Sequence, residues 1–191
     1  MKTVKANSGF LAAILNPLFL LMVFVGTWPL SGCQTVPDAT SYCDQARAYE
    51  SEGQYFEAIS EYTKAIEINP RCTEAYFNRG NVYQRWGQFD HAISDYNKAI
   101  EIGPIKSSEV YNNRGNAFQR KGHYDRAISD YNKAIEIDPK NARAYSNRGV
   151  AHHLKGEYDE AWKDVHKAQS LGFQVPEEFL KELQKASGRE G

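Results

Sequence analysis

Apolar and aromatic side chains recur along most of the chain with the spacing of amphipathic helices. Tyr76, Gly80 and Tyr83 lie at i, i+4 and i+7, which places them on one face of a helix. A second set follows with the same spacing: Ala92, Tyr96 and Ala99. Gly87 lies between the two sets and predicts a turn, where a residue without a Cβ is least strained. Pro104 follows the second set and cannot continue a helix, so the pattern predicts two helices joined by a short turn.

This pair of helices is repeated along the chain. The seven residues that begin at Ala75 return, with few changes, from Val110 and from Ala144. The nine residues that begin at Ala92 return from Ala127. The period is 34 residues, with one residue inserted between the second and third copies. Four copies fit the chain, at 39–72, 73–106, 108–141 and 142–175.

With its regular Gly, Ala and Pro positions, this pattern resembles the tetratricopeptide repeat family over 39–175. The resemblance implies an all-α fold, a right-handed solenoid of four antiparallel helix pairs whose first helices line a concave groove. Pro176 then opens one more helix, with Glu177 and Glu178 in its first turn. We therefore expect a C-terminal capping helix at 176–187, because the end of a repeat array needs a polar outer face for solubility.

The start of the chain has the layout of a secretory signal peptide. Lys2 and Lys5 form a short positive region, and an apolar run at 10–25 follows them. The alternative is an uncleaved membrane helix, since the run approaches the roughly 20 residues that a span requires. Asn16 and Pro17 break the run and favour the signal peptide.

The tetrapeptide LSGC that ends at Cys33 resembles the lipobox of bacterial lipoproteins. In that family the cysteine sulfur receives a diacylglycerol, and the chain is cut directly before it. The resemblance implies a signal peptide at 1–32 and a tether at 33–38, lipidated at Cys33. It also implies a location in the cell envelope, with membrane contact through the lipid anchor only. In lipoproteins of bacteria with two membranes, an Asp directly after the lipidated cysteine keeps the protein in the inner membrane. This chain has Gln34 there, so in such a cell we expect the protein in the outer membrane, facing the periplasm.

Composition and motifs argue against several functions. Lys and Arg number 23 and Asp and Glu 24, so no basic excess points to nucleic acid. The sequence has no Gly-rich phosphate loop, no Gly-x-Ser-x-Gly and no His-Glu-x-x-His. His152 and His153 are adjacent, so on a helix they point about 100° apart and cannot face one metal ion. We therefore expect no enzyme, no metal, no cofactor and no small-molecule substrate.

Charged residues recur at equivalent positions of the repeats. Arg79, Arg114 and Arg148 lie in the first helices, and the second helices carry the matching acids: Asp95, Asp130 and Asp164. In the first repeat the equivalents are Gln45 and Glu61, so arginine and aspartate appear together. We predict an Arg–Asp contact between the two helices of each later repeat; a ligand-binding role for these arginines is the alternative.

Two further cysteines bracket the first repeat. Cys43 lies at the start of its first predicted helix, and Cys72 lies just past the end of its second. These two points are neighbours in an antiparallel hairpin, and an exported protein with an even pair of cysteines invites a disulfide. We predict a Cys43–Cys72 disulfide, with two free thiols as the alternative.

The first helices carry a polar stripe opposite their packing face, so we expect it to be exposed in the groove. The second and third repeats repeat its composition: Glu74, Asn78, Asn81 and Arg85, then Glu109, Asn113, Asn116 and Arg120. The fourth repeat keeps Arg143 and Asn147. The stripe is either solvated only or binds peptide. In the second case Asn78, Asn113 and Asn147 form a ladder, because an amide can both donate to and accept from a peptide backbone.

The carboxylate clamp of chaperone-binding tetratricopeptide proteins is only partly present. Asn81, Asn113 and Arg143 match it, but Phe77 and Asn147 stand where basic residues are needed. The sequence therefore favours a lipid-anchored adaptor that binds a protein or an extended peptide in its groove. The alternatives are a passive structural subunit of an envelope assembly, held through its outer helices, and an enzyme.

Overall fold

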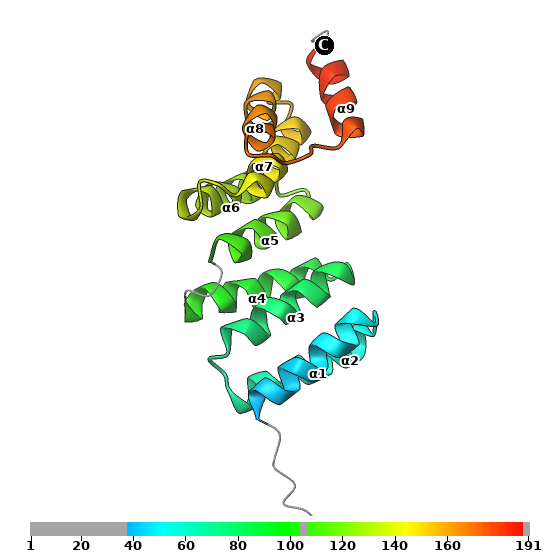
Figure 1. Ribbon diagram of the computed structural model, residues 1–191, viewed down its shortest axis with the longest axis vertical. Helices are drawn as coiled ribbons and strands as arrows, with labels where there is room; N and C mark the ends of the chain where they lie inside the picture. The colour runs from blue at the N-terminus through cyan, green and yellow to red at the C-terminus, as the bar shows by residue number, and fades with distance from the viewer. Residues whose placement is uncertain (1–37, 104–106, 189–191) are drawn as a thin grey trace, which may run out of the picture. The chain divides into compact units, whose positions relative to one another are not determined.

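The computed structural model describes residues 38–103 and 107–188, and every regular element in these two ranges is an α-helix (Figure 1). They lie in one compact unit, Pro37–Gly191. In chain order they are α1 (Ala39–Ser51), α2 (Tyr55–Ile68), α3 (Thr73–Arg85), α4 (Phe89–Ile102), α5 (Ser107–Arg120), α6 (Tyr124–Ile137), α7 (Ala142–Lys155), α8 (Tyr158–Ser170) and α9 (Glu177–Ser187). The predicted all-α helical repeat fold is confirmed.

The first eight helices pack as four hairpins stacked in chain order. Within each hairpin a short turn joins the two helices, and its glycine has a positive φ, as Gly122 does at 78°. The second helix of each hairpin also packs on the first helix of the next. In addition, α3 contacts α5 and α5 contacts α7. The first helices of the later hairpins therefore lie along one side of the stack.

Glycines in α3 and α5 allow a buried ring to fill the second and third hairpins. A Cβ added to Gly80 would lie 2.8 Å from the Tyr96 ring, and one added to Gly115 would lie 2.7 Å from the Tyr131 ring. Both rings are fully buried. In the last hairpin Val165 takes the place of the ring. The expected close approach of the two helices therefore depends on these small residues.

The last helix, α9, packs on α8 and covers the end of the stack. Leu183 is fully buried, and it shares a core cluster with Val165 of α8 and with Phe179 of α9. The Trp162 indole of α8 donates a hydrogen bond to the Ser187 hydroxyl at 3.1 Å. The remaining face of α9 is polar, as a capping helix requires.

The predicted signal peptide at 1–32 and the tether at 33–37, with Cys33, lie outside the described residues. Of the predicted tether, Asp38 is described, and its carboxylate accepts a hydrogen bond from the Ser41 amide at 2.8 Å. It thereby caps the N-terminus of α1. Among the helices described, none has the length and apolar character needed to cross a bilayer.

Candidate functional site

An arginine ties together the two helices of each later repeat. Arg114 of α5 donates from Nε and Nη2 to the two carboxylate oxygens of Asp130 on α6, at 2.8 and 2.6 Å. The same two-fold contact joins the equivalent pairs: Arg79 with Asp95 and Arg148 with Asp164. The predicted Arg–Asp contacts are confirmed. Because these side chains are largely buried between helices, they support the scaffold that presents the groove.

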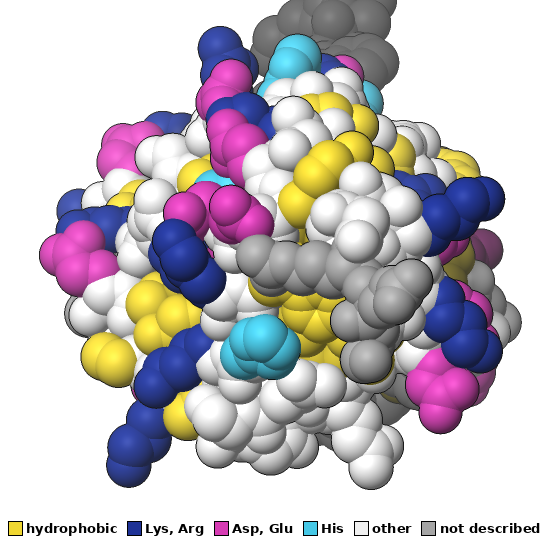
Figure 2. Space-filling model, turned by 90° about the horizontal axis from the view of Figure 1, so that it is seen from above, with side chains coloured by type: hydrophobic (Ala, Val, Ile, Leu, Met, Phe, Trp, Pro, Cys, Tyr) yellow, Lys and Arg dark blue, Asp and Glu magenta, His cyan; other side chains and the backbone are white. Residues whose placement is uncertain are grey.

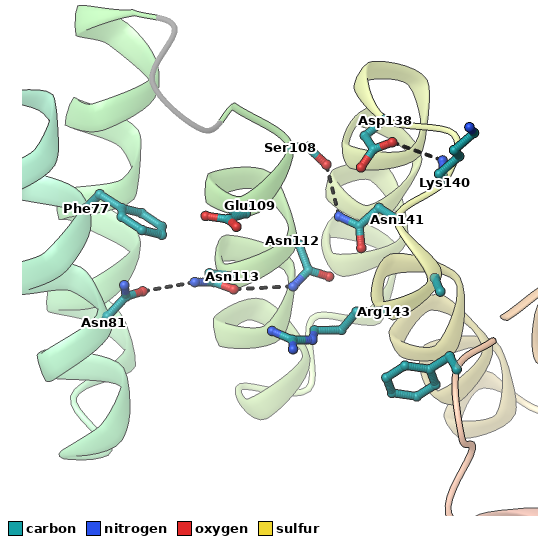
Figure 3. Close-up of a pocket in the computed structure, with 12 residues that line it drawn as sticks. Phe77, Asn81, Ser108, Glu109, Asn112, Asn113, Asp138, Lys140, Asn141 and Arg143 are labelled. Atoms are coloured by element: carbon teal, nitrogen blue, oxygen red, sulfur yellow. Dashed lines mark hydrogen bonds between the residues drawn. The ribbon is translucent and has the colours of Figure 1, made fainter. Parts of the chain in front are cut away.

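The first helices α3, α5 and α7 line a hollowed surface. A cavity of about 560 Å³ lies between them, lined among others by Phe77, Asn112 and Arg143 (Figure 3). A second cavity, of about 450 Å³, lies nearer the hairpin turns, and Arg120 and Asn147 line it. Of the ten predicted groove residues, eight line one of these two cavities: Asn81, Arg85, Glu109, Asn113, Asn116, Arg120, Arg143 and Asn147. Glu74 and Asn78 line neither.

A chain of asparagine amides crosses the groove from α7 to α3. Asn147 Nδ2 donates to Asn112 Oδ1 at 3.0 Å, and Asn112 Nδ2 donates to Asn113 Oδ1 at 3.3 Å. Asn113 Nδ2 then donates to Asn81 Oδ1 at 2.9 Å (Figure 3). The Tyr96 hydroxyl ends the chain by donating to the same Asn81 oxygen at 2.8 Å. Burial raises the pKa of this hydroxyl, so it stays a donor.

This arrangement differs from the ladder predicted from the sequence. Asn78 takes no part in it, whereas Asn112, one residue before a predicted member, links two neighbouring helices. The amides are also half-buried and not fully exposed, because they lie where adjacent first helices approach each other. Asn112 is almost fully buried, at 3% exposed. Spacing along one helix identified the stripe, but it could not show which amides meet across helices.

The charged ends of the stripe are more exposed than its centre. Glu74 forms an ion pair with Arg47 at 2.6 Å, and Arg85 forms one with Glu50 at 2.8 Å. The Arg120 guanidinium lies over the Phe89 ring, 5.7 Å from its centroid. Arg143 differs from these, because no residue in the described ranges forms an ion pair or hydrogen bond with its exposed guanidinium. It extends from α7 toward α5 in Figure 3.

Charges of both signs alternate elsewhere on the surface. On the face shown in Figure 2, Lys and Arg side chains lie among Asp and Glu side chains, with no broad area of one sign. Some of these charges join neighbouring hairpins, as Lys155 of α7 does with Asp125 of α6 at 2.7 Å. Such exposed pairs contribute little stability each.

The two histidines of α7 serve packing. His152 Nδ1 lies 2.6 Å from Glu157 Oε2, and the His153 ring packs against the Tyr158 and Phe179 rings, with centroids 5.8 and 5.5 Å away. As the sequence predicted, they face different neighbours. Phe179 belongs to α9, so the capping helix covers the His153 position at the end of the array.

Cys43 and Cys72 lie side by side in the core of the first hairpin. Cys43 of α1 is 4% exposed, and Cys72 packs against the same cluster at the start of α3. Burial, and after it the neighbouring Cys72 thiol, raises the pKa of Cys43 to about 12. The structure holds both as free thiols. Their pairing in a disulfide stays a prediction.

Comparisons with known proteins identify the repeats. A family model described as TPR repeat matches 46–87 and 115–156, and a second, described as tetratricopeptide repeat, matches 73–104. Together the matched segments cover more than half of the chain, and neither describes a catalytic family. A search of curated proteins found no match.

Solved structures show the same fold. MamA is 28% identical, with a TM-score of 0.66, over 70% of this chain and 78% of its own. The first TPR of Spaghetti (RPAP3), solved bound to the HSP90 peptide SRMEEVD, is 28% identical, with a TM-score of 0.58, over 61% of this chain and 91% of its own. The TPR domain of Arabidopsis OM64 is 25% identical, with a TM-score of 0.58, over 60% and 94%.

Proposed function

Because this chain belongs to the tetratricopeptide repeat family, we propose that it is an adaptor that binds a protein or an extended peptide in the groove lined by α3, α5 and α7. The observation that carries the proposal is the combination of the amide chain across the groove with the guanidinium of Arg143, which is unpaired among the described residues. Amides offer donors and acceptors to a peptide backbone, and a free guanidinium attracts a carboxylate.

A similar domain that was solved with a bound peptide supports this choice of ligand. The RPAP3 domain holds the peptide SRMEEVD, which is acidic near its C-terminus. In the register of a carboxylate clamp, Asn81, Asn113 and Arg143 have the matching residue types here, and two of these three join in the amide chain. Phe77 and Asn147 replace the remaining basic positions. We therefore propose an extended segment with a single acidic group near Arg143, not the full clamp.

Site-specific photocrosslinking in cells distinguishes this adaptor from a passive subunit. A photoreactive residue at Arg85 or Arg120 reports on the groove, and one at Ser94 or Ser129 reports on exposed positions of α4 and α6. An adaptor yields one discrete partner from the groove positions. Crosslinks from Ser94 and Ser129 alone would instead support the assembly subunit held through its outer helices.

Once that partner is purified, Arg143→Ala is expected to weaken its binding roughly 10-fold or more, the effect of losing one charge-assisted hydrogen bond. Isothermal titration calorimetry measures the affinity. Arg143 is a sharper probe than Asn113 or Asn147, because those amides also hold the groove together. Arg71→Ala, which removes an exposed arginine outside the groove, is the matched control. Equal affinity of the two variants would contradict a role for Arg143.

We also propose that the adaptor is lipid-anchored through Cys33 in the cell envelope, as the LSGC motif indicates. The Cys33→Ala variant is expected to lose lipid labelling and normal cleavage, since the thiol is the acyl acceptor. Mass spectrometry of the mature N-terminal peptide measures both, with Cys72→Ser as the control that keeps the anchor. A mature wild-type N-terminus without lipid mass would contradict the anchor and leave the groove proposal unaffected.

A further inference from the structure

The arginines at equivalent positions of the later repeats share one recurring environment. Arg114 donates to both oxygens of Asp130 and, at 2.6 Å, to the Asn97 side chain of the preceding hairpin. Its guanidinium also lies 5.3 Å from the centroid of the Tyr111 ring and 6.0 Å from that of Phe118. Arg79 and Arg148 likewise contact an aspartate, a polar side chain of the preceding hairpin and at least one ring. An acid, an oxygen and flanking rings thus define a guanidinium site.

The first hairpin has the acid and the rings, but it has no arginine at the equivalent position. Glu61 of α2 stands at the aspartate position, and Tyr42 and Tyr49 of α1 stand at the two ring positions. The residue between these rings is Gln45, which is exposed. Glu61 is only 8% exposed, and its buried Oε2 has no hydrogen-bond partner within the described parts of the chain. A buried carboxylate oxygen without a donor is rare in folded proteins and points to a missing partner.

A neighbouring lysine satisfies only half of this carboxylate. Lys64 Nζ donates to Glu61 Oε1 at 2.6 Å and lies 5.6 Å from the Tyr42 ring centroid. Its equivalents in the next two hairpins pair in the opposite direction along the helix, Lys98 with Glu101 and Lys133 with Glu136. Glu61 therefore attracts the nearest cation away from its usual partner. An ammonium contacts one oxygen, whereas a guanidinium fork can contact both.

We propose that the α1–α2 end of the array binds an arginine side chain of a partner protein, held by Glu61 between Tyr42 and Tyr49. The 37 residues before Asp38 contain Lys2 and Lys5 but no arginine, so that segment supplies no guanidinium. The side chain of Lys64 is 47% exposed and free to return toward Glu67 when the guanidinium enters. This site lies outside the groove of α3, α5 and α7. It would therefore be a second binding site, in addition to the groove proposed to bind a protein or peptide.

Filling the site from within tests its geometry. Gln45→Arg places a guanidinium at the position equivalent to Arg114 and is expected to raise the melting temperature by about 2–4 °C, as one hydrogen bond of ordinary net strength does in a chain of this length. Gln45→Lys is the matched control, and its melting temperature is expected to lie within about 1 °C of that of the wild type, the effect of an ordinary surface substitution. A melting temperature lowered by Gln45→Arg would overturn the proposal.

Binding is tested with the full repeat region and a small probe. Nα-acetyl-arginine amide is expected to shift the NMR ring signals of Tyr42 and Tyr49 at concentrations at least about 10-fold lower than Nα-acetyl-lysine amide, because only the guanidinium contacts both oxygens. Gln45→Arg should abolish these shifts, as should Glu61→Leu, which removes the carboxylate at similar volume. Equal responses to the two probes, or shifts that persist in Gln45→Arg, would overturn the site.

Light scattering of the wild type and Gln45→Arg identifies the source of the arginine. We expect both to have the same mass, since the proposed arginine comes from a different protein. A wild-type dimer that Gln45→Arg converts to a monomer would overturn this assignment and show that a second copy supplies the guanidinium.

Discussion

Replacing Arg114 by alanine is expected to lower the free energy of unfolding by about 3–5 kcal/mol, the usual effect of removing one partner from a buried ion pair. Asp130 is 5% exposed, and both of its carboxylate oxygens accept from Arg114. Without the guanidinium its charge stays buried and unpaired. The variant also loses the hydrogen bond to Asn97 of the preceding hairpin. Urea unfolding followed by circular dichroism measures the change.

Two controls show that burial, and not charge alone, causes this loss. Lys133→Ala breaks the exposed pair with Glu136 and is expected to change the free energy of unfolding by less than about 1 kcal/mol. The double variant Arg114→Leu with Asp130→Leu removes both charges and is expected to be more stable than Arg114→Ala, because no buried charge remains. A loss of under 1 kcal/mol for Arg114→Ala would mean that the pair does not support the scaffold.

The scaffold was predictable from sequence because the repeat supplies its own comparison. Arg79, Arg114 and Arg148 each occur with an aspartate 16 positions later, and the first hairpin has neither residue at the equivalent positions. Two residue types that appear and disappear together indicate contact, and the structure confirms it. Small residues at Gly80 and Gly115 similarly predicted close helices, since a Cβ there would overlap the Tyr96 and Tyr131 rings.

The groove was predictable only as a surface. A stripe at helical spacing identifies residues on one side of one helix, and eight of the ten named residues line its two cavities. Which amides meet depends on how far neighbouring helices are displaced along their axes. Asn112 therefore joins Asn113 to Asn147, and Asn78 remains outside the chain of amides.

The first hairpin shows a different limit of sequence reasoning. The repeat pattern shows Gln45 and Glu61 at the positions of the arginine and the aspartate, but it does not show how Glu61 is packed. Only the three-dimensional arrangement shows that Glu61 is buried, that one of its oxygens lacks a donor among the described residues, and that Tyr42 and Tyr49 pack against the core of the same hairpin. Burial of a single atom depends on the packing of both helices, and no pattern along the chain reports it.

Oxidation of Cys43 and Cys72 to a disulfide is expected to stabilise the first hairpin by roughly 3–4 kcal/mol in the chain-entropy model, because the bond closes a loop that spans both of its helices. The structure places both cysteines in one core cluster, at the start of α1 and at the N-cap of α3. Urea unfolding of the oxidised and reduced protein measures the difference. The Cys72→Ser variant cannot form the bond, so a reductant should leave its free energy of unfolding unchanged.

The chemistry of closure should depend on pH. Burial raises the pKa of Cys43 to about 12, so near neutral pH its thiol is protonated and a poor nucleophile. Cys72, the more exposed of the two, attacks a disulfide oxidant first and forms a mixed disulfide. Cys43 then loses its proton, attacks the Cys72 sulfur and expels the oxidant as a thiolate. The rate of this second step should rise with pH, because burial keeps the Cys43 thiol protonated near neutral pH. Quenching the reaction by alkylation at timed points, followed by mass spectrometry, measures this rate. Two thiols that remain alkylatable after isolation from an oxidising compartment would contradict the pairing.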